Sequence, residues 1–309
     1  MSAMTFRMCS GIACAALLSA ASWAADPVVV QKTFPTPEAA AEALFAAAET
    51  YDVPALKAIA GPDGVDLVVT DDPVLDKKLA AEFAAQARVK TQYVRDPKNP
   101  KNVTLVLGAE NWPAPTPLVE KNGTWRFDSK KGREEILFRR IGTNEFDAID
   151  VCVGYVEAQH EYASQKRDGS PVNQYAQRII STSGKQDGLA WKTADGTWAG
   201  PVGEDIAKYI AEGYSDRYEP FHGYYFKTLK GQGPAAPMGE MSFVVNGVMI
   251  GGFALVAAPA TYRVTGVKTF IVSNTGIVYQ KDLGPSTLDQ FRLMETYNPD
   301  KTWTPVETP

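Results

Sequence analysis

The sequence has few of the side chains that metal and acid–base sites use. It contains three cysteines and two histidines in 309 residues. His160-Glu161 begins like the metalloprotease motif His-Glu-x-x-His, but position 164 is a serine. Glu157 and His160 could share a metal on one helix face, yet a di-metal bundle needs a second Glu-x-x-His, which the sequence does not contain. We therefore expect no metal site.

Cofactor motifs are also lacking. There is no Walker lysine loop, no Gly-x-Ser-x-Gly elbow and no paired-cysteine motif. Residues 231–236 formally match a dinucleotide-binding fingerprint, whose phosphate-binding helix would have to start at Pro234. Pro237 and Gly239 would end that helix at once, so we expect a loop there and no cofactor.

Long hydrophobic runs are confined to the N-terminus. Arg7 precedes the apolar run 11–21, which is shorter than the roughly 20 apolar residues of a membrane span. Ser22 and Ala24 have the small-x-small spacing that signal peptidase recognises. Residues 1–24 are therefore predicted to be a signal peptide, cleaved after Ala24 or Ala25.

A lipoprotein anchored through Cys14 is the alternative interpretation of this segment. The preceding residues Gly11-Ile12-Ala13 lack the leucine usual three positions before such a cysteine. No later apolar stretch approaches a spanning length, so we expect a soluble mature chain without a membrane span. Its expected location is the periplasm or the exterior.

Cysteine is scarcer still after cleavage. Cys9 and Cys14 leave with the signal peptide, so Cys152 is the only thiol of the mature chain and no internal disulfide can form. We expect Cys152 to pack as a small apolar residue in a long helix.

Basic residues are outnumbered by acidic ones. The chain has 31 Lys and Arg against 36 Asp and Glu, a net charge of −5, and loss of Arg7 with the signal peptide lowers it to −6. The densest basic stretch, 130–140, also contains Glu134 and Glu135. A duplex-binding face needs clustered bases, so nucleic acid is not an expected partner.

The hydrophobic pattern predicts an N-terminal α+β domain over residues 26–128. Helices are expected over 39–50 after the capping residue Thr36, after Asp52 up to Gly61-Pro62, and over 74–88. Period-two alternation then follows through 103–107, and Asn122-Gly123 predicts a hairpin turn before Trp125 and Phe127.

The second predicted domain covers residues 129–309. It begins with a helix from Asp128 or Ser129 that is interrupted at Gly142. A long helix over 144–165 follows, with apolar stripes on two sides: Phe146, Ile149, Val153, Val156 and His160 form one, and Val151, Tyr155, Ala158 and Tyr162 form the other. A short helix is expected near 206–212. Gly251-Gly252 predicts a bulge or a close backbone approach. Strands are predicted at 223–229, 241–245, 248–256, 267–272 and 277–281, with a hairpin turn at 274–276.

The run His222-Gly223-Tyr224-Tyr225-Phe226 is one of several with a recognisable pattern. Together these runs resemble a known bacterial secreted family, domain of unknown function 2950, and the resemblance covers nearly the whole mature chain. It implies an envelope location and no known activity or catalytic residues. The other runs are 147–152, 155–159, 175–182, 232–237, 246–255 and 278–284.

The C-terminal half contains a long helix with Ala158-Gln159 and Tyr162-Ala163, and then the strand from Gly223. With the later segments 258–259, 265–266, Phe270 and 274–277, this order resembles the globular heads of pseudopilins. It implies a helix packed across an antiparallel sheet of about four strands. The chain departs from that family in lacking the long hydrophobic N-terminal helix through which pilins polymerise, so filament assembly does not transfer.

The strongest candidate for chemistry is the aromatic segment 214–226. Aromatic faces beside a few polar groups suit a ligand pocket, and the same residues would equally form a strand and its cover over a core. Asn246 at a bend and Lys281-Asp282 at a strand end could add polar groups or serve as turn residues. The candidate ligand-binding residues are Tyr218, Phe221, His222, Tyr224, Asn246, Lys281 and Asp282.

Three classes of function stay open from the sequence. The leading hypothesis is a non-catalytic envelope protein that binds a small ligand or another envelope protein. The second is a hydrolase that uses His222 as base with Glu219 or Asp216 as its orienting carboxylate, because histidine titrates nearest neutral pH. The third is a structural subunit with a broad exposed apolar patch.

Overall fold

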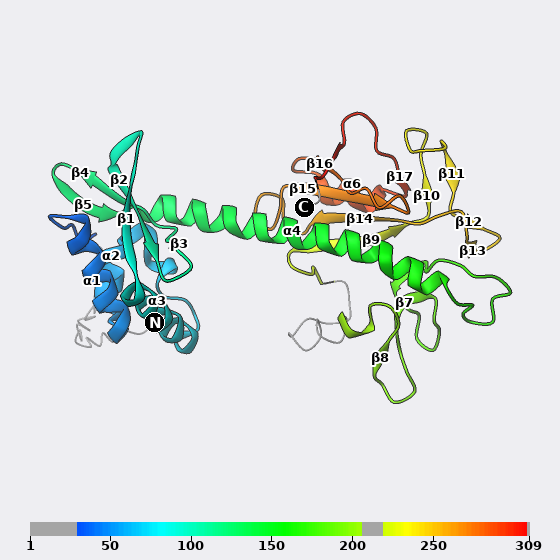
Figure 1. Ribbon diagram of the computed structural model, residues 1–309, viewed down its shortest axis with the longest axis horizontal. Coiled ribbons are helices and arrows are strands. Elements are labelled where there is room, and N and C mark those ends of the chain that lie inside the picture. The colour runs from blue at the N-terminus through cyan, green and yellow to red at the C-terminus, as the bar shows by residue number, and fades with distance from the viewer. Residues whose placement is uncertain (1–29, 206–218, 308–309) are drawn as a thin grey trace, which may run out of the picture. The chain divides into compact units, whose positions relative to one another are not determined.

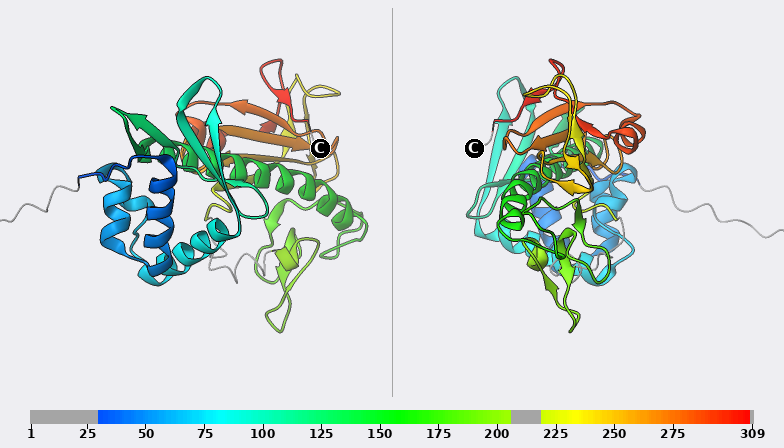
Figure 2. Two further views of the ribbon diagram at one scale, coloured as in Figure 1. Left: turned by 60° about the vertical axis from the view of Figure 1, so that its left-hand side comes forward. Right: turned by 90° about the vertical axis from the view of Figure 1, so that its right-hand side faces the viewer.

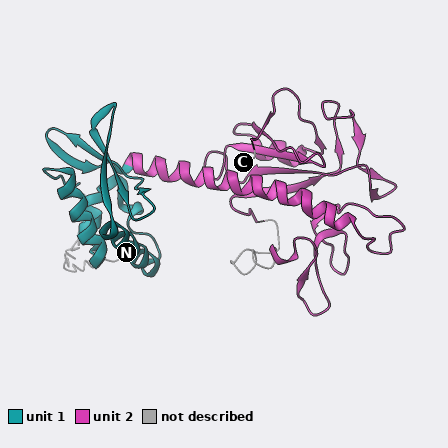
Figure 3. Cartoon of the chain, viewed as in Figure 1, with its two compact units in different colours: residues 1–129 teal, residues 130–309 magenta. Residues whose placement is uncertain are grey.

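The computed structural model describes residues 30–205 and 219–307 of the chain. The chain divides after Ser129 into two compact units, shown in different colours in Figure 3. Each unit combines helices with a mainly antiparallel principal sheet, so the predicted α+β class is confirmed. The predicted helix near 206–212 lies outside the described residues, as does the signal segment.

The helices of unit 1 start where capping residues satisfy their first N–H groups. Thr36 Oγ1 accepts a hydrogen bond from Ala39 N at 3.1 Å, and Asp52 and Asp72 cap the next two α-helices in the same way. Gly61, at φ 72°, ends the second. The three predicted helices are confirmed. The elements are α1 (Pro37–Thr50), α2 (Val53–Ala60), the 3-10 helix η1 (Pro62–Leu67) and α3 (Pro73–Val89).

An antiparallel sheet covers these helices in unit 1. Its strand order is β1-β2-β4-β5, and β3 pairs with β2. Asn122 and Gly123 both have positive φ, 55° and 78°, and form the predicted hairpin turn between β4 and β5. The strands are β1 (Thr91–Asp96), β2 (Asn99–Leu107), β3 (Trp112–Pro113), β4 (Leu118–Lys121) and β5 (Thr124–Phe127).

Helix α4 (Ser129–Ala163) is one uninterrupted helix of 35 residues, so the predicted break at Gly142 is wrong. A glycine inside a helix costs only about 1 kcal/mol relative to alanine. Without a proline beside it, Gly142 weakens the helix but does not end it. None of the helices in the described parts of the chain has the length and apolar character needed to cross a membrane.

The buried face of α4 follows one of the two predicted stripes. Tyr155, Ala158 and Tyr162 of that stripe are buried, as predicted. In the other stripe Phe146 and Val153 are 71% and 37% exposed, so the prediction is wrong at these two positions. Cys152 is fully buried in the core as predicted, and burial raises the pKa of its thiol. The positions buried at helical spacing are Ala148, Cys152, Tyr155, Gln159 and Tyr162.

This face of α4 lies along the principal sheet of unit 2 (Figure 1, Figure 2). The strand order is β18-β16-β15-β14-β9, and every pairing is antiparallel. On β9, Phe226 faces the α4 side while its neighbours Tyr225 and Lys227 contact α6 on the other face. The elements are β9 (Tyr224–Leu229), β14 (Ala254–Pro259), β15 (Lys268–Ser273), β16 (Tyr279–Asp282), α6 (Thr287–Leu293) and β18 (Thr304–Pro305).

Three small sheets complete unit 2. Their orders are β6-β7-β8, β11-β10-β17 and β12-β13. Each of the predicted strands 241–245 and 248–256 is divided into two shorter strands. Residues 250–253 belong to no strand and separate β13 from β14. The strands are β6 (Arg178–Ile180), β7 (Gly188–Lys192), β8 (Trp198–Ala199), β10 (Gly231–Gln232), β11 (Met241–Ser242), β12 (Val244–Val245), β13 (Val248–Met249) and β17 (Thr296–Tyr297).

Gly251 and Gly252 are needed where the chain crosses residues 242–243. A Cβ on Gly251 would lie 2.8 Å from the carbonyl oxygen of Ser242. A Cβ on Gly252 would lie 2.9 Å from the ring of Phe243. Both distances are too short for any side chain, so the predicted close backbone approach is confirmed.

Gln159 ties α4 to the segment that leads into β6. Its side-chain amide donates to the Tyr155 hydroxyl and to Ala176 O, each at 2.8 Å, and its carbonyl oxygen accepts from Ala176 N at 2.8 Å. Gln159 and Ala176 are both fully buried. This side chain therefore satisfies both backbone polar groups of a residue that has no access to water.

We predict that Gln159→Leu destabilises unit 2 by roughly 3 kcal/mol, because an unpaired buried polar group costs about 1 to 3 kcal/mol and two would be left. Gln177→Leu is the matched control, since Gln177 donates one bond to Gly247 O at a more exposed site. Urea unfolding followed by circular dichroism measures both. Equal stability of the two variants would show that the Gln159 bonds contribute little.

Candidate functional site

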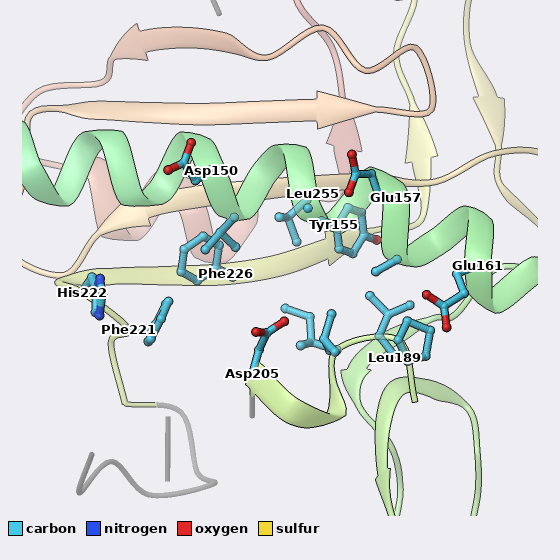
Figure 4. A pocket seen from close by; sticks show the side chains of 16 residues that line it. Asp150, Tyr155, Glu157, Glu161, Leu189, Asp205, Phe221, His222, Phe226 and Leu255 are labelled. Carbon is cyan, nitrogen blue, oxygen red and sulfur yellow. The ribbon is translucent and has the colours of Figure 1, made fainter. Parts of the chain in front are cut away.

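A cavity of about 550 Å³ lies in unit 2 beside α4 (Figure 4). Its volume is within the range typical of small-molecule sites, about 300 to 1,000 Å³. Most of the lining is apolar, and these side chains come from α4, the small sheet β6-β7-β8 and the principal sheet. The apolar residues that line it are Val151, Tyr155, Ala158, Ile179, Leu189, Pro201, Val202, Phe221, Phe226 and Leu255.

The packing of α4 on the sheet fixes one wall of the cavity. Tyr155 belongs both to this wall and to the core, and its hydroxyl donates to Ala254 O at 3.3 Å. Burial raises the pKa of Tyr155 to about 12, so the hydroxyl stays a hydrogen-bond donor at neutral pH. Phe226 on β9 and Leu255 on β14 line the cavity from the neighbouring strands.

His222 stands at one end of the cavity in a tight turn. Phe221 and Tyr224 exchange two backbone hydrogen bonds of 2.8 and 2.9 Å around it. His222 and Gly223 both have positive φ, 44° and 75°, as a two-residue hairpin turn of the primed type requires. A Cβ on Gly223 would lie 2.7 Å from Asn144 Nδ2, so this position needs glycine.

The imidazole of His222 is oriented by a carboxylate of α4. His222 Nδ1 lies 2.5 Å from Asp147 Oδ2, and the ring stacks on Phe221 at a centroid distance of 4.1 Å. The two side chains are 38% and 33% exposed. Such a pair can hold one tautomer of the ring and accept or donate a proton at Nε2.

Four further carboxylates line the cavity. Asp150, Glu157 and Glu161 follow one another along α4, and Asp205 lies across from them (Figure 4). None of the described lining residues is Lys or Arg. Within the described chain no three His, Cys, Asp or Glu side chains gather closely enough to hold a metal ion. The lining therefore combines an apolar surface with negative charge.

The residues that we predicted from the aromatic segment fall into different surroundings. Phe221 and His222 line the cavity. Tyr224 is fully buried in the core, and its hydroxyl donates to Lys268 O at 2.9 Å. Tyr218 lies outside the described residues. The segment thus contributes both to the cavity and to the core.

The other three predicted site residues do not line the cavity. Asn246 occupies the turn between β12 and β13 with φ 51°. Lys281 Nζ lies 5.7 Å from the centre of the Trp303 ring. Asp282 accepts hydrogen bonds from the Tyr262 hydroxyl and from Gly284 N.

The structure places Asp147 beside His222, a carboxylate that the sequence analysis did not consider. Asp147 precedes His222 by 75 residues and reaches it from α4. Of the two carboxylates that we did consider, Asp216 lies outside the described residues. The sequence does contain a signal for the acidic side of the cavity. Asp147, Asp150, Glu157 and Glu161 recur at helical spacing along one helix.

Comparison with known proteins identifies the family. The family model described as protein of unknown function (DUF2950) matches residues 31–306, so the chain belongs to this family. No curated protein and no solved structure matches the chain.

Proposed function

We propose that this DUF2950 protein is an exported, non-catalytic binding protein of the bacterial cell envelope that holds a small ligand with an apolar body in the cavity of unit 2. The observation that carries the proposal is the cavity itself. An apolar surface of this size, open to the outside and edged with a few polar groups, is the usual form of a small-molecule site.

Export is part of this proposal and is supported by the sequence alone. The segment 1–24 has the charge, apolar run and small-residue spacing of a signal peptide. Cys152, the single thiol of the predicted mature chain, is buried, which suits a compartment where an exposed thiol would oxidise.

The likeness to pseudopilin heads stays a proposal about shape. It is supported by the arrangement of α4 along an antiparallel sheet whose strands follow it in the chain. It adds no function, because a helix on a sheet hosts many unrelated activities.

A hydrolase is the second candidate, and one observation favours it. His222 lines the cavity and is paired with Asp147 at 2.5 Å, the arrangement of a base held by a carboxylate. Such a pair would activate a water molecule through Nε2. A covalent route would need a serine, threonine or cysteine nucleophile instead, and the described lining residues include none. Binding is the better supported function because most of the lining is an apolar surface, which suits holding a ligand.

A structural subunit is supported less. Ile136, Phe138 and Phe146 on α4 are 41%, 65% and 71% exposed and would suit contact with another protein. Nothing in the described residues identifies what covers them, whereas the cavity has a definite size and chemistry.

The first test blocks the cavity without disturbing the core. Gly154 lines the cavity on α4, and a Cβ there meets no atom within 4 Å. We predict that wild type binds Nile red saturably and that Gly154→Phe binds it at least about tenfold more weakly, since the ring occupies space a ligand of this size needs. Fluorescence titration measures both affinities.

Gly142→Phe is the matched control. Gly142 is a second glycine of α4 with open space around it, and it does not line the cavity. Both substitutions should leave the helix at least as stable, because glycine is a poor helix former. Unchanged Nile red affinity in Gly154→Phe, or an equal loss in both variants, would exclude the cavity as the binding site.

The second test separates binding from hydrolysis. Glycine adopts positive φ readily, so His222→Gly removes the imidazole and keeps the turn. We predict that wild type releases p-nitrophenol from p-nitrophenyl butyrate no faster than His222→Gly or Asp147→Asn. Saturable turnover that falls about 10²- to 10⁴-fold in His222→Gly would establish the hydrolase instead.

A further inference from the structure

We propose that the ligand of this cavity is a small organic cation, an apolar body that carries a positively charged group. The inference rests on the proposed binding function and adds the chemical class of the ligand. It follows from the charge of the lining, which is negative on both sides of the cavity among the described residues.

The carboxylates are placed along the length of the cavity. Asp150 and Glu161 are eleven residues apart on α4, which corresponds to about 16 Å along the helix axis. Glu157 lies between them, and Asp205 faces the helix from the helical residues 203–205 that follow β8 (Figure 4). A ligand lying against the apolar surface would have a carboxylate within reach at either end.

Three basic side chains of the described neighbouring elements have partners outside the cavity. Lys227 is next to the lining residue Phe226 but points to the other face of the sheet, where it donates to Arg292 O at 3.0 Å. Arg178 pairs with Asp187 at 3.6 Å. Arg167 lies over the rings of Tyr162 and Trp191, 4.9 Å from each centroid. None of these cations neutralises the lining.

The end of α4 gives a second reason to regard the charge as selected for binding. Glu161 lies in the last turn of the helix, where the helix dipole disfavours a negative side chain. The charge therefore does not stabilise the helix, and local rules are most often broken at functional sites.

An organic cation fits better than a bare metal ion. No group of three candidate metal ligands exists in the described chain, and the carboxylates are distributed along the cavity. Most of the cavity surface is apolar, and a bare metal ion would make no favourable contact with it. A ligand with both an apolar body and a cationic group uses both features of the site.

Three probes that share one apolar chain test the inference. Isothermal titration calorimetry compares dodecyltrimethylammonium, dodecyl maltoside and dodecyl sulfate, each below its micelle concentration, on the whole mature protein. We expect the cation to bind about tenfold more tightly than the anion at low salt. The preference should shrink in 1 M salt, where the screening length falls to about 3 Å.

Two pairs of substitutions show where the preference originates. Glu161→Gln/Asp205→Asn removes two lining charges, and Glu134→Gln/Glu240→Gln removes two exposed charges of unit 2 that do not line the cavity. We expect the first pair to reduce the preference to about threefold or less and the second to leave it unchanged. Because Glu161 opposes the helix dipole, the first pair should fold normally.

The outcomes distinguish the two proposals. Equal binding of the three probes, or a cation preference that survives Glu161→Gln/Asp205→Asn, would overturn the inference while the binding function stands. Failure of all three probes to bind would remove the binding function, and the inference with it.

Discussion

The packing of one face of α4 on the principal sheet of unit 2 is the interaction on which the rest of that unit depends. Tyr155 and Gln159 carry most of its specificity, because each brings a polar group into the interior and satisfies it there. The same contact builds the cavity. Tyr155 and Ala158 belong both to the buried core and to the wall of the cavity, and Val151 beside them extends the wall.

Much of this fold could be predicted from local patterns. Capping residues predicted where the helices of unit 1 begin, and Asn122-Gly123 predicted the hairpin turn. Gly251-Gly252 predicted a close approach of two backbone segments. Each of these signals depends on only a few neighbouring residues. Strand β1 was not predicted. Tyr93 and Val94 are strand-forming residues, but they are adjacent rather than alternating, and polar residues surround them. Pairing with β2 is what establishes the strand.

The candidate site was less predictable, because it depends on contacts over long distances in the chain. The aromatic segment pointed to Phe221 and His222, and the structure brings both to the cavity. The partner carboxylate could not be chosen from neighbours in sequence, because Asp147 is 75 residues from His222 and the packing of α4 on the sheet brings the two together. Tyr224 was predicted as a ligand-binding residue but is fully buried in the core. The residue type alone does not distinguish an aromatic side chain of a pocket from one of the core.

The central claim is that the cavity of unit 2 is where a ligand binds. Methyl-labelled NMR of the whole protein, titrated with dodecyltrimethylammonium, tests it most directly. The account predicts chemical-shift changes at the methyl groups of Ile179, Leu189 and Leu255, which line the cavity, and none at Leu105 and Leu107 in the core of unit 1. Shifts that spread over unit 1 or leave the cavity methyls unmoved would contradict it.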